Sequence, residues 1–130
     1  MVVCLFAFGC SSANHQRLLQ KTVHAYHQQL RWRLLDEALT YVSFSFRDRW
    51  EKAHVGADSN LRIVSVERRA VKSDEVSENA ARFIVKVTWY IEGQMRVRES
   101  EWVEDWSLRS GNWQLTEEKR LDGASPSNWP

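Results

Sequence analysis

Apolar residues in the first half of the chain recur at helical spacing. Four of them follow one another at intervals of four, three and four positions and so form one face of a helix: Leu19, Val23, Tyr26 and Leu30. No Gly or Pro interrupts 14–31, so one continuous helix is expected there. Two shorter helices are expected next, one capped by Asp36 and one opened by the capping-box pair Ser45 and Asp48.

Beyond residue 60 the apolar positions alternate instead. The alternation predicts four strands, which cover 61–71, 81–92, 94–108 and 113–118. The second strand alternates most regularly, and its inward positions are Phe83, Val85, Val87, Trp89 and Ile91. Helices followed by a strand meander predict an α+β fold, with the N-terminal helices packed on a curved antiparallel sheet of about four strands.

The N-terminal segment has the pattern of a secretory leader. Val2–Phe8 is apolar; it is too short for a span of about 20 residues but long enough for the apolar part of a signal peptide. The positive residues that usually precede that part are missing, so either the chain begins further upstream or the segment is not a signal. The run Ala7-Phe8-Gly9-Cys10 resembles a bacterial lipobox, which implies a diacylated Cys10. The alternative is a buried N-terminal segment with ordinary apolar cysteines.

The lipobox resemblance also implies a location. Ser11 follows Cys10, whereas an Asp at this place retains lipoproteins at the inner membrane, so the outer membrane facing the periplasm is expected. The two lipid chains would be the contact with the membrane. The expected division of the chain is a signal-peptide remnant over 1–9, a lipidated tether over 10–16, the folded domain over 17–122 and a flexible tail over 123–130.

Charge and spacing exclude several other classes of partner. The net charge of +1 lacks the basic excess of nucleic-acid-binding domains, so no nucleic-acid partner is expected. His24 and His27 lie three residues apart on the expected helix, but no third ligand has metal-site spacing. The sequence has no Gly-rich phosphate loop and no nucleophile elbow, so neither a metal nor another cofactor is expected.

The order of elements and several side chains resemble the nuclear transport factor 2-like superfamily, also called the cystatin-like α+β roll or SnoaL-like fold. The resemblance covers 17–119 and rests on Tyr26, Leu30-Arg31-Trp32, Ala38, Val42, Arg47, Trp89-Tyr90, and Trp106 and Leu108 facing Trp113 and Leu115. It points to the small, uncharacterised bacterial lipoprotein branch. Relatives often have a Gln two residues before the hairpin Trp, where this chain has Glu104.

The resemblance implies a cone-shaped fold with an interior pocket. The residues expected to line that pocket are Tyr26, Trp32, Phe83, Val85, Val87, Trp89, Trp102 and Trp106. Glu99 and Glu101 would point inward in a regular third strand that continued the parity of Met95 and Val97. A bulge between Arg98 and Glu101 would turn both outward, and we expect this because an uncompensated buried carboxylate is costly. The two glutamates are therefore weak candidates for acid–base catalysis, and no catalytic residue is assigned.

Two functional hypotheses follow from this interior. The first is a non-catalytic cell-envelope lipoprotein that binds a small apolar ligand or a protein partner, with a homodimer through the sheet as one form of partner. The second is a small pocket enzyme of the ketosteroid isomerase or polyketide cyclase type, with a carboxylate as acid and base. An interior acid beside a cavity would favour the enzyme, and a filled cone would favour the binding protein.

Overall fold

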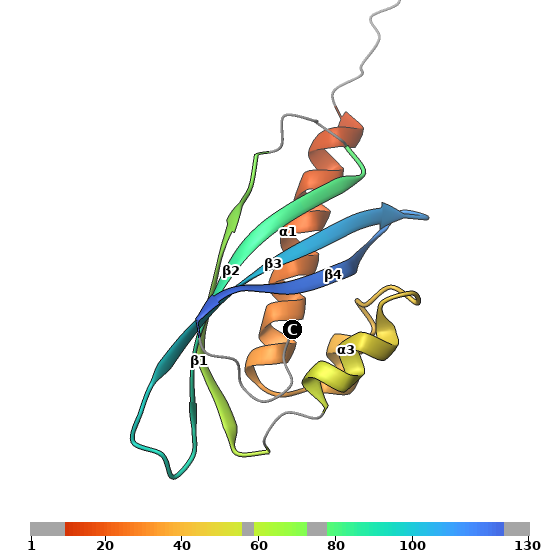
Figure 1. The fold of residues 1–130 in the computed structure, drawn as a ribbon. Coiled ribbons are helices and arrows are strands. Elements are labelled where there is room, and N and C mark those ends of the chain that lie inside the picture. The colour runs from red at the N-terminus through yellow and green to blue at the C-terminus, as the bar shows by residue number, and fades with distance from the viewer. Residues whose placement is uncertain (1–9, 56–58, 73–77, 124–130) are drawn as a thin grey trace, which may run out of the picture.

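The chain folds as helices followed by a four-stranded antiparallel sheet, which confirms the predicted α+β class (Figure 1). The computed structural model describes residues 10–55, 59–72 and 78–123. The elements are α1 (Cys10–Arg31), α2 (Leu35–Leu39), α3 (Arg47–His54), β1 (Leu61–Ala70), β2 (Ala80–Ile91), β3 (Arg98–Arg109) and β4 (Asn112–Gly123). The expected leader over 1–9 and the tail beyond Gly123 lie outside the described residues.

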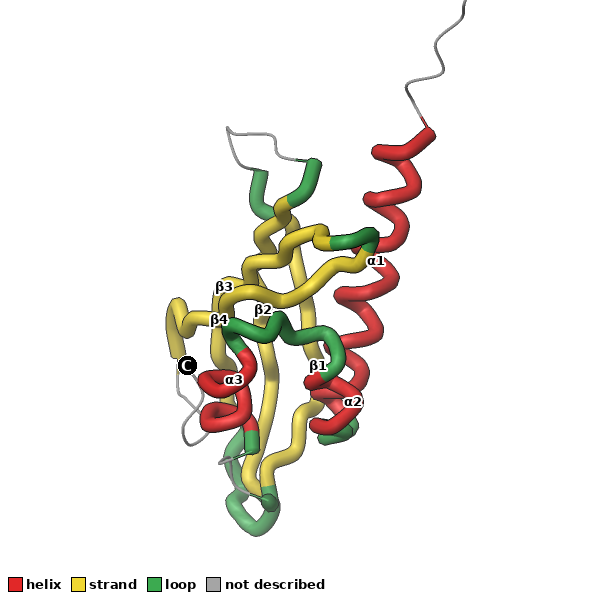
Figure 2. The backbone as a smooth tube through the Cα atoms, turned by 90° about the vertical axis from the view of Figure 1, so that its right-hand side faces the viewer, coloured by secondary structure: helices red, strands yellow, loops and turns green. Residues whose placement is uncertain are grey.

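Helix α1 packs its predicted apolar stripe against the sheet. Leu19, Val23, Tyr26 and Leu30 are all buried, and α1 contacts both edge strands, β1 and β4. In Figure 2 the helix runs along one side of the molecule, with the sheet on its other side. The helix begins at Cys10. The segment 10–16, which was expected to form a tether, is therefore the N-terminal part of α1.

The sheet is regular in its centre and bulged near β4. Strands β2 and β3 pair without interruption from Ala80 opposite Ser107 to Trp89 opposite Arg98. Between β3 and β4 the register shifts twice, and β4 contributes the extra residue each time, Thr116 and then Leu121. Such bulges bend a strand and increase its twist, which gives the sheet its curvature.

The third strand pairs with β2 without the predicted bulge between Arg98 and Glu101, so that prediction is wrong. The two glutamates nevertheless point outward, as the bulge would have made them do. Strand β3 begins at Arg98, so Met95 lies outside it and cannot set the parity of the strand. Inward positions are therefore Ser100, Trp102, Glu104 and Trp106, all buried. Glu99 and Glu101 point to the outer face without any bulge in β3, and the Glu99 side chain is 60% exposed.

The predicted helix caps are also wrong. Leu34 precedes α2 and Phe46 precedes α3, and neither side chain makes a capping hydrogen bond. The backbone determines how the chain leads into both helices: Arg33 turns with a positive φ of 57°, and the Ser43 N–H donates to the carbonyl of Leu115 on β4. Asp36 instead lies within the first turn of α2, where its negative charge interacts favourably with the helix dipole.

Candidate functional site

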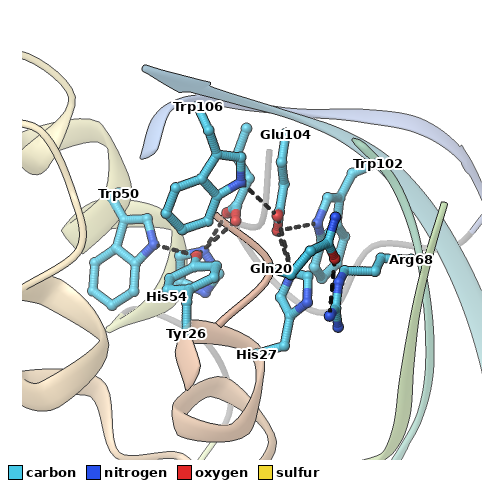
Figure 3. A network of polar contacts seen from close by, with 10 residues as sticks. Gln20, Tyr26, His27, Trp50, His54, Arg68, Trp102, Glu104 and Trp106 are labelled. Carbon is cyan, nitrogen blue, oxygen red and sulfur yellow. Dashed lines mark hydrogen bonds and ion pairs between the residues drawn. The ribbon is translucent and has the colours of Figure 1, made fainter. Parts of the chain in front are cut away.

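Five polar side chains meet inside the cone, between the helices and the sheet (Figure 3). We call them the interior cluster: Tyr26 and His27 from α1, His54 from α3, Glu104 from β3 and Glu118 from β4. All five are nearly or fully buried. The indole N–H groups of Trp50, Trp102 and Trp106 surround them as hydrogen-bond donors.

Glu104 is the charged centre of the cluster. His27 Nε2 lies 2.9 and 3.0 Å from its two oxygens, and the indoles of Trp102 and Trp106 donate to it at 3.1 and 3.2 Å. Burial raises the pKa of Glu104, but attraction to His27 and these hydrogen bonds outweigh it, so the pKa lies below its ordinary value. The carboxylate is thus stabilised as an anion in the protein interior.

Glu118 has the opposite electrostatic character. The Tyr26 hydroxyl donates to its Oε2 at 2.6 Å and itself accepts the Trp50 indole N–H at 2.9 Å. Burial and repulsion by Glu104 raise the pKa of Glu118 well above its ordinary value. Burial likewise raises the pKa of Tyr26, with repulsion by both glutamates adding to it. Both shifts favour the neutral form of the group concerned.

The contact between His54 and Glu118 is a hydrogen bond of neutral groups. His54 Nε2 lies 2.7 Å from Glu118 Oε1, a distance that would also fit an ion pair. Burial lowers the pKa of His54 to about 3, helped by repulsion from Arg33, so the imidazole stays neutral. We favour the neutral description because both partners are fully desolvated and nearby Glu104 already holds the negative charge.

The two glutamates are direct partners on neighbouring strands. Glu104 on β3 is registered with Glu118 on β4, and both side chains point inward. Like charges directly opposite one another are destabilising, and more so in a dry interior. The pair therefore holds one proton, on Glu118, and one negative charge, on Glu104.

Sequence reasoning missed all the acids and bases of this cluster. Glu104 could have been found, because it shares parity with Trp102 and Trp106, which were both expected to face inward. Glu118 could not, since the extra residue Thr116 sets the face on which it lies. His27 follows Tyr26 at the edge of the apolar stripe, where nothing in the pattern separates a buried imidazole from an exposed one.

The residues expected to line a pocket are almost all buried. Those that are at most 3% exposed are Tyr26, Phe83, Val85, Val87, Trp89, Trp102 and Trp106. Trp32 is the exception, because it follows the end of α1 and is 66% exposed, so its expected interior place is wrong. Cys10, the expected lipidation site, is the first residue of α1.

The geometry gives no support to a metal site or a membrane-spanning helix. In the parts of the chain that the structure describes, no three His, Cys, Asp or Glu residues are grouped to bind a metal ion. His24 is exposed while His27 points inward to Glu104, so the two do not form a site. None of the described helices is both long and apolar enough to cross a bilayer.

Comparison with known proteins supports the fold alone. No family model and no curated protein matches the sequence. One similar structure is described as a Ca/calmodulin-dependent kinase II association domain from Exiguobacterium sibiricum, with a TM-score of 0.63 and 15% identity over 86% of this chain and 95% of that one. Another, from Novosphingobium aromaticivorans, is described as a scytalone dehydratase, with a TM-score of 0.59 and 11% identity over 87% of this chain and 88% of that one. Both have the nuclear transport factor 2-like fold, and this chain shares it.

Proposed function

We propose that this chain is a non-catalytic cell-envelope lipoprotein, anchored through Cys10 to the outer membrane and facing the periplasm, whose domain binds a protein partner. The observation that carries the proposal is the closed interior cluster. Glu104 is 0% and Glu118 2% exposed, and each carboxyl group takes its hydrogen bonds from side chains of the cluster or from the tryptophans that surround it. An acid or base that serves a substrate must instead be within reach of it.

Mutual pairing of the cluster favours a structural role for it. Tyr26, Glu118 and His54 connect α1, β4 and α3, while His27 and Glu104 connect α1 to β3. Within the described residues, His27 Nδ1 is buried without a hydrogen-bond partner, but both carboxyl groups and the Tyr26 hydroxyl are paired. A polar network paired in this way specifies one arrangement of the elements around it.

Close packing of aromatic side chains around the cluster favours a protein partner over a small apolar ligand. The aromatic side chains that would line a ligand pocket pack against the cluster; the Tyr26 and Trp106 ring centroids, for example, lie 5.4 Å apart. One structural neighbour is described as an association domain, which is consistent with a role in assembly. A second copy bound through the outer face of the sheet is one such partner, and analytical ultracentrifugation of the purified chain tests for it.

Labelling of cells with a radioactive fatty acid tests the anchor. The chain expressed with its native upstream sequence should take up label and fractionate with membranes, and Cys10→Ser should abolish both. Cys4→Ser is the matched control, since it removes the other cysteine of the chain and should leave labelling unchanged. Unlabelled wild-type chain, or equal labelling of Cys10→Ser, would refute the lipoprotein assignment.

A small pocket enzyme remains the second candidate, because one observation favours it. Glu118 is held protonated between Tyr26 and His54, and such perturbed carboxyl groups are concentrated at catalytic sites. One structural neighbour is described as a dehydratase. Solvent-deuterium exchange into a β,γ-unsaturated ketone, followed by NMR, separates the two functions. Exchange by the wild type that is lost in Glu118→Gln would establish the enzyme, and no exchange supports the binding protein.

A further inference from the structure

The outward face of α1 carries a row of basic residues from Arg17 to the C-terminal end of the helix. Arg17, His24 and Arg31 are exposed and follow one another at steps of seven residues, which bring a helix back to nearly the same side. Lys21 is also exposed and lies one turn after Arg17. Position 10, where α1 begins, precedes Arg17 by another seven residues, so the helix register aligns it with this row.

No acidic residue balances these charges within the helix itself, and the neighbouring helix α2 carries Asp36 and Glu37 beyond its C-terminal end. The 22 residues of α1 include no Asp or Glu. On the neighbouring strand, Arg68 faces the helix and donates to Gln20 at 3.4 Å, whereas Glu67 pairs in register with Lys86 on the outer face. In the described ranges, no carboxylate forms an ion pair with Arg17, Lys21 or Arg68.

An exposed tryptophan ends the same face. Trp32 continues the helical turn, because its N–H donates to the Gln28 carbonyl at 3.1 Å. Its ring is 66% exposed, and the Arg31 guanidinium lies over it at 5.4 Å from the centroid. An exposed indole beside cations is the composition that protein segments present to the headgroup region of a bilayer. Contact with a bilayer would account for the exposed position of Trp32, whereas a place in the core would not.

We propose that this face, comprising Arg17, Lys21, His24, Arg31 and Trp32, lies on a surface of anionic phospholipid with α1 parallel to the membrane. The proposal rests on the lipid anchor at Cys10, which would hold one end of the face at the bilayer. A helix of 22 residues is about 33 Å long, so the anchor and Trp32 would contact the membrane at opposite ends of the helix. The cations between them attract anionic headgroups, and the sheet is turned away from the membrane.

Vesicle binding of charge-reversal variants tests the face separately from the anchor. The full chain with Cys10→Ser, which lacks the lipid, is mixed with vesicles of phosphatidylcholine and phosphatidylglycerol, and the bound fraction is measured by sedimentation. Arg17→Glu with Lys21→Glu should weaken the partition coefficient by at least about 30-fold, because the loss of two attractive charges alone accounts for that much and the two new negative charges add repulsion. The matched control is Arg96→Glu with Lys119→Glu, an equal change of charge at exposed positions outside α1, which should have little effect. Thermal unfolding of all variants verifies that they are folded.

Each outcome tests membrane binding by this face of α1 independently of whether Cys10 is acylated. Selective loss of binding in the α1 pair, with no binding of any variant to pure phosphatidylcholine, supports the proposal. Equal binding of the two pairs overturns it, and the lipoprotein assignment stands if Cys10 is acylated. Loss of binding to duplex DNA rather than to vesicles in the α1 pair would also overturn it, since the face would then serve nucleic acid.

Discussion

Glu104 and Glu118 are the residues whose chemistry depends most on their neighbours. They have the same side chain and are registered with each other on adjacent strands, yet the pKa of Glu104 is lowered and that of Glu118 is raised. The difference comes from their partners. Glu104 has His27 and two indole donors, whereas Glu118 has a phenol and a neutral imidazole. Substitution by glutamine should therefore affect the two sites differently.

Glu104→Gln should lower the free energy of unfolding by about 3 kcal/mol, because it removes the carboxylate to which His27 and two indole N–H groups are hydrogen-bonded in the interior. Glu118→Gln should cost less than about 1.5 kcal/mol, because an amide replaces a group that is already neutral and can still bond to Tyr26. Urea denaturation of both variants at pH 7 measures the difference. A larger cost at Glu118 would mean that the negative charge resides there instead.

At the scale of elements, β4 is the strand that closes the site. Its extra residue, Thr116, lies between inward Leu115 and outward Glu117, and the Thr116 hydroxyl donates to the Asp105 carbonyl at 3.1 Å. Because two residues of β4 stand opposite one of β3 at this point, Glu118 faces inward. A regular strand of the same sequence would turn it to the outer face.

Deletion of Thr116 should be tolerated better than deletion of Gln114, two positions earlier. Without Thr116 the strand becomes regular and Leu115 and Glu118 keep their inward faces, at a cost of about 1–2 kcal/mol for the lost hydrogen bond and curvature. Without Gln114 the buried Trp113 turns outward, which should cost about 3–5 kcal/mol. Thermal midpoints compare the two, and equal losses would place the bulge elsewhere in β4.

The elements with strong periodicity were predictable from the sequence, and the polar site was not. The stripe of α1 and the alternation of β2 each continue through enough residues to determine which face is buried. Caps and bulges depend on single residues and on contacts with distant backbone, as between Ser43 and Leu115. Of the interior cluster, only Glu104 follows a periodic pattern, the alternation of Trp102 and Trp106 on β3, whereas the inward direction of Glu118 depends on the extra residue Thr116.

At the scale of the whole molecule, the cluster should make stability nearly independent of pH over a defined range. Between about 4.5 and 6.5, the ordinary pKa values of a carboxyl and an imidazole, the unfolded chain binds a proton at His54 that the folded chain does not. As long as Glu118 stays protonated in the folded chain, that chain binds a proton there which the unfolded chain loses above about 4.5, because burial raises the pKa of Glu118. The contributions of the two groups to the slope of stability against pH are opposite in sign and cancel.

Glu118→Gln should reveal the imidazole contribution. Without the raised pKa of Glu118, stability should fall by about 1.4 kcal/mol per pH unit as the pH decreases from 6.5, because only the unfolded state then gains a proton, at His54. The wild type should stay level down to about 4.5 and fall below that, where the lowered pKa values of Glu104 and His54 both favour unfolding. Chemical denaturation at a series of pH values measures both profiles. Parallel profiles would show that Glu118 is ionised in the folded state.

The residues of the cluster are far apart along the chain, and this determines when the interior can form during synthesis. Tyr26 is made early, but its acceptor Glu118 follows 92 residues later, on the last strand. Until that strand leaves the ribosome, Tyr26, Trp50 and His54 have no carboxyl group of Glu118 to join them, and the interior cannot close. A nascent chain therefore keeps Tyr26, Trp50 and His54 open to water until the segment that includes Glu118 has been made.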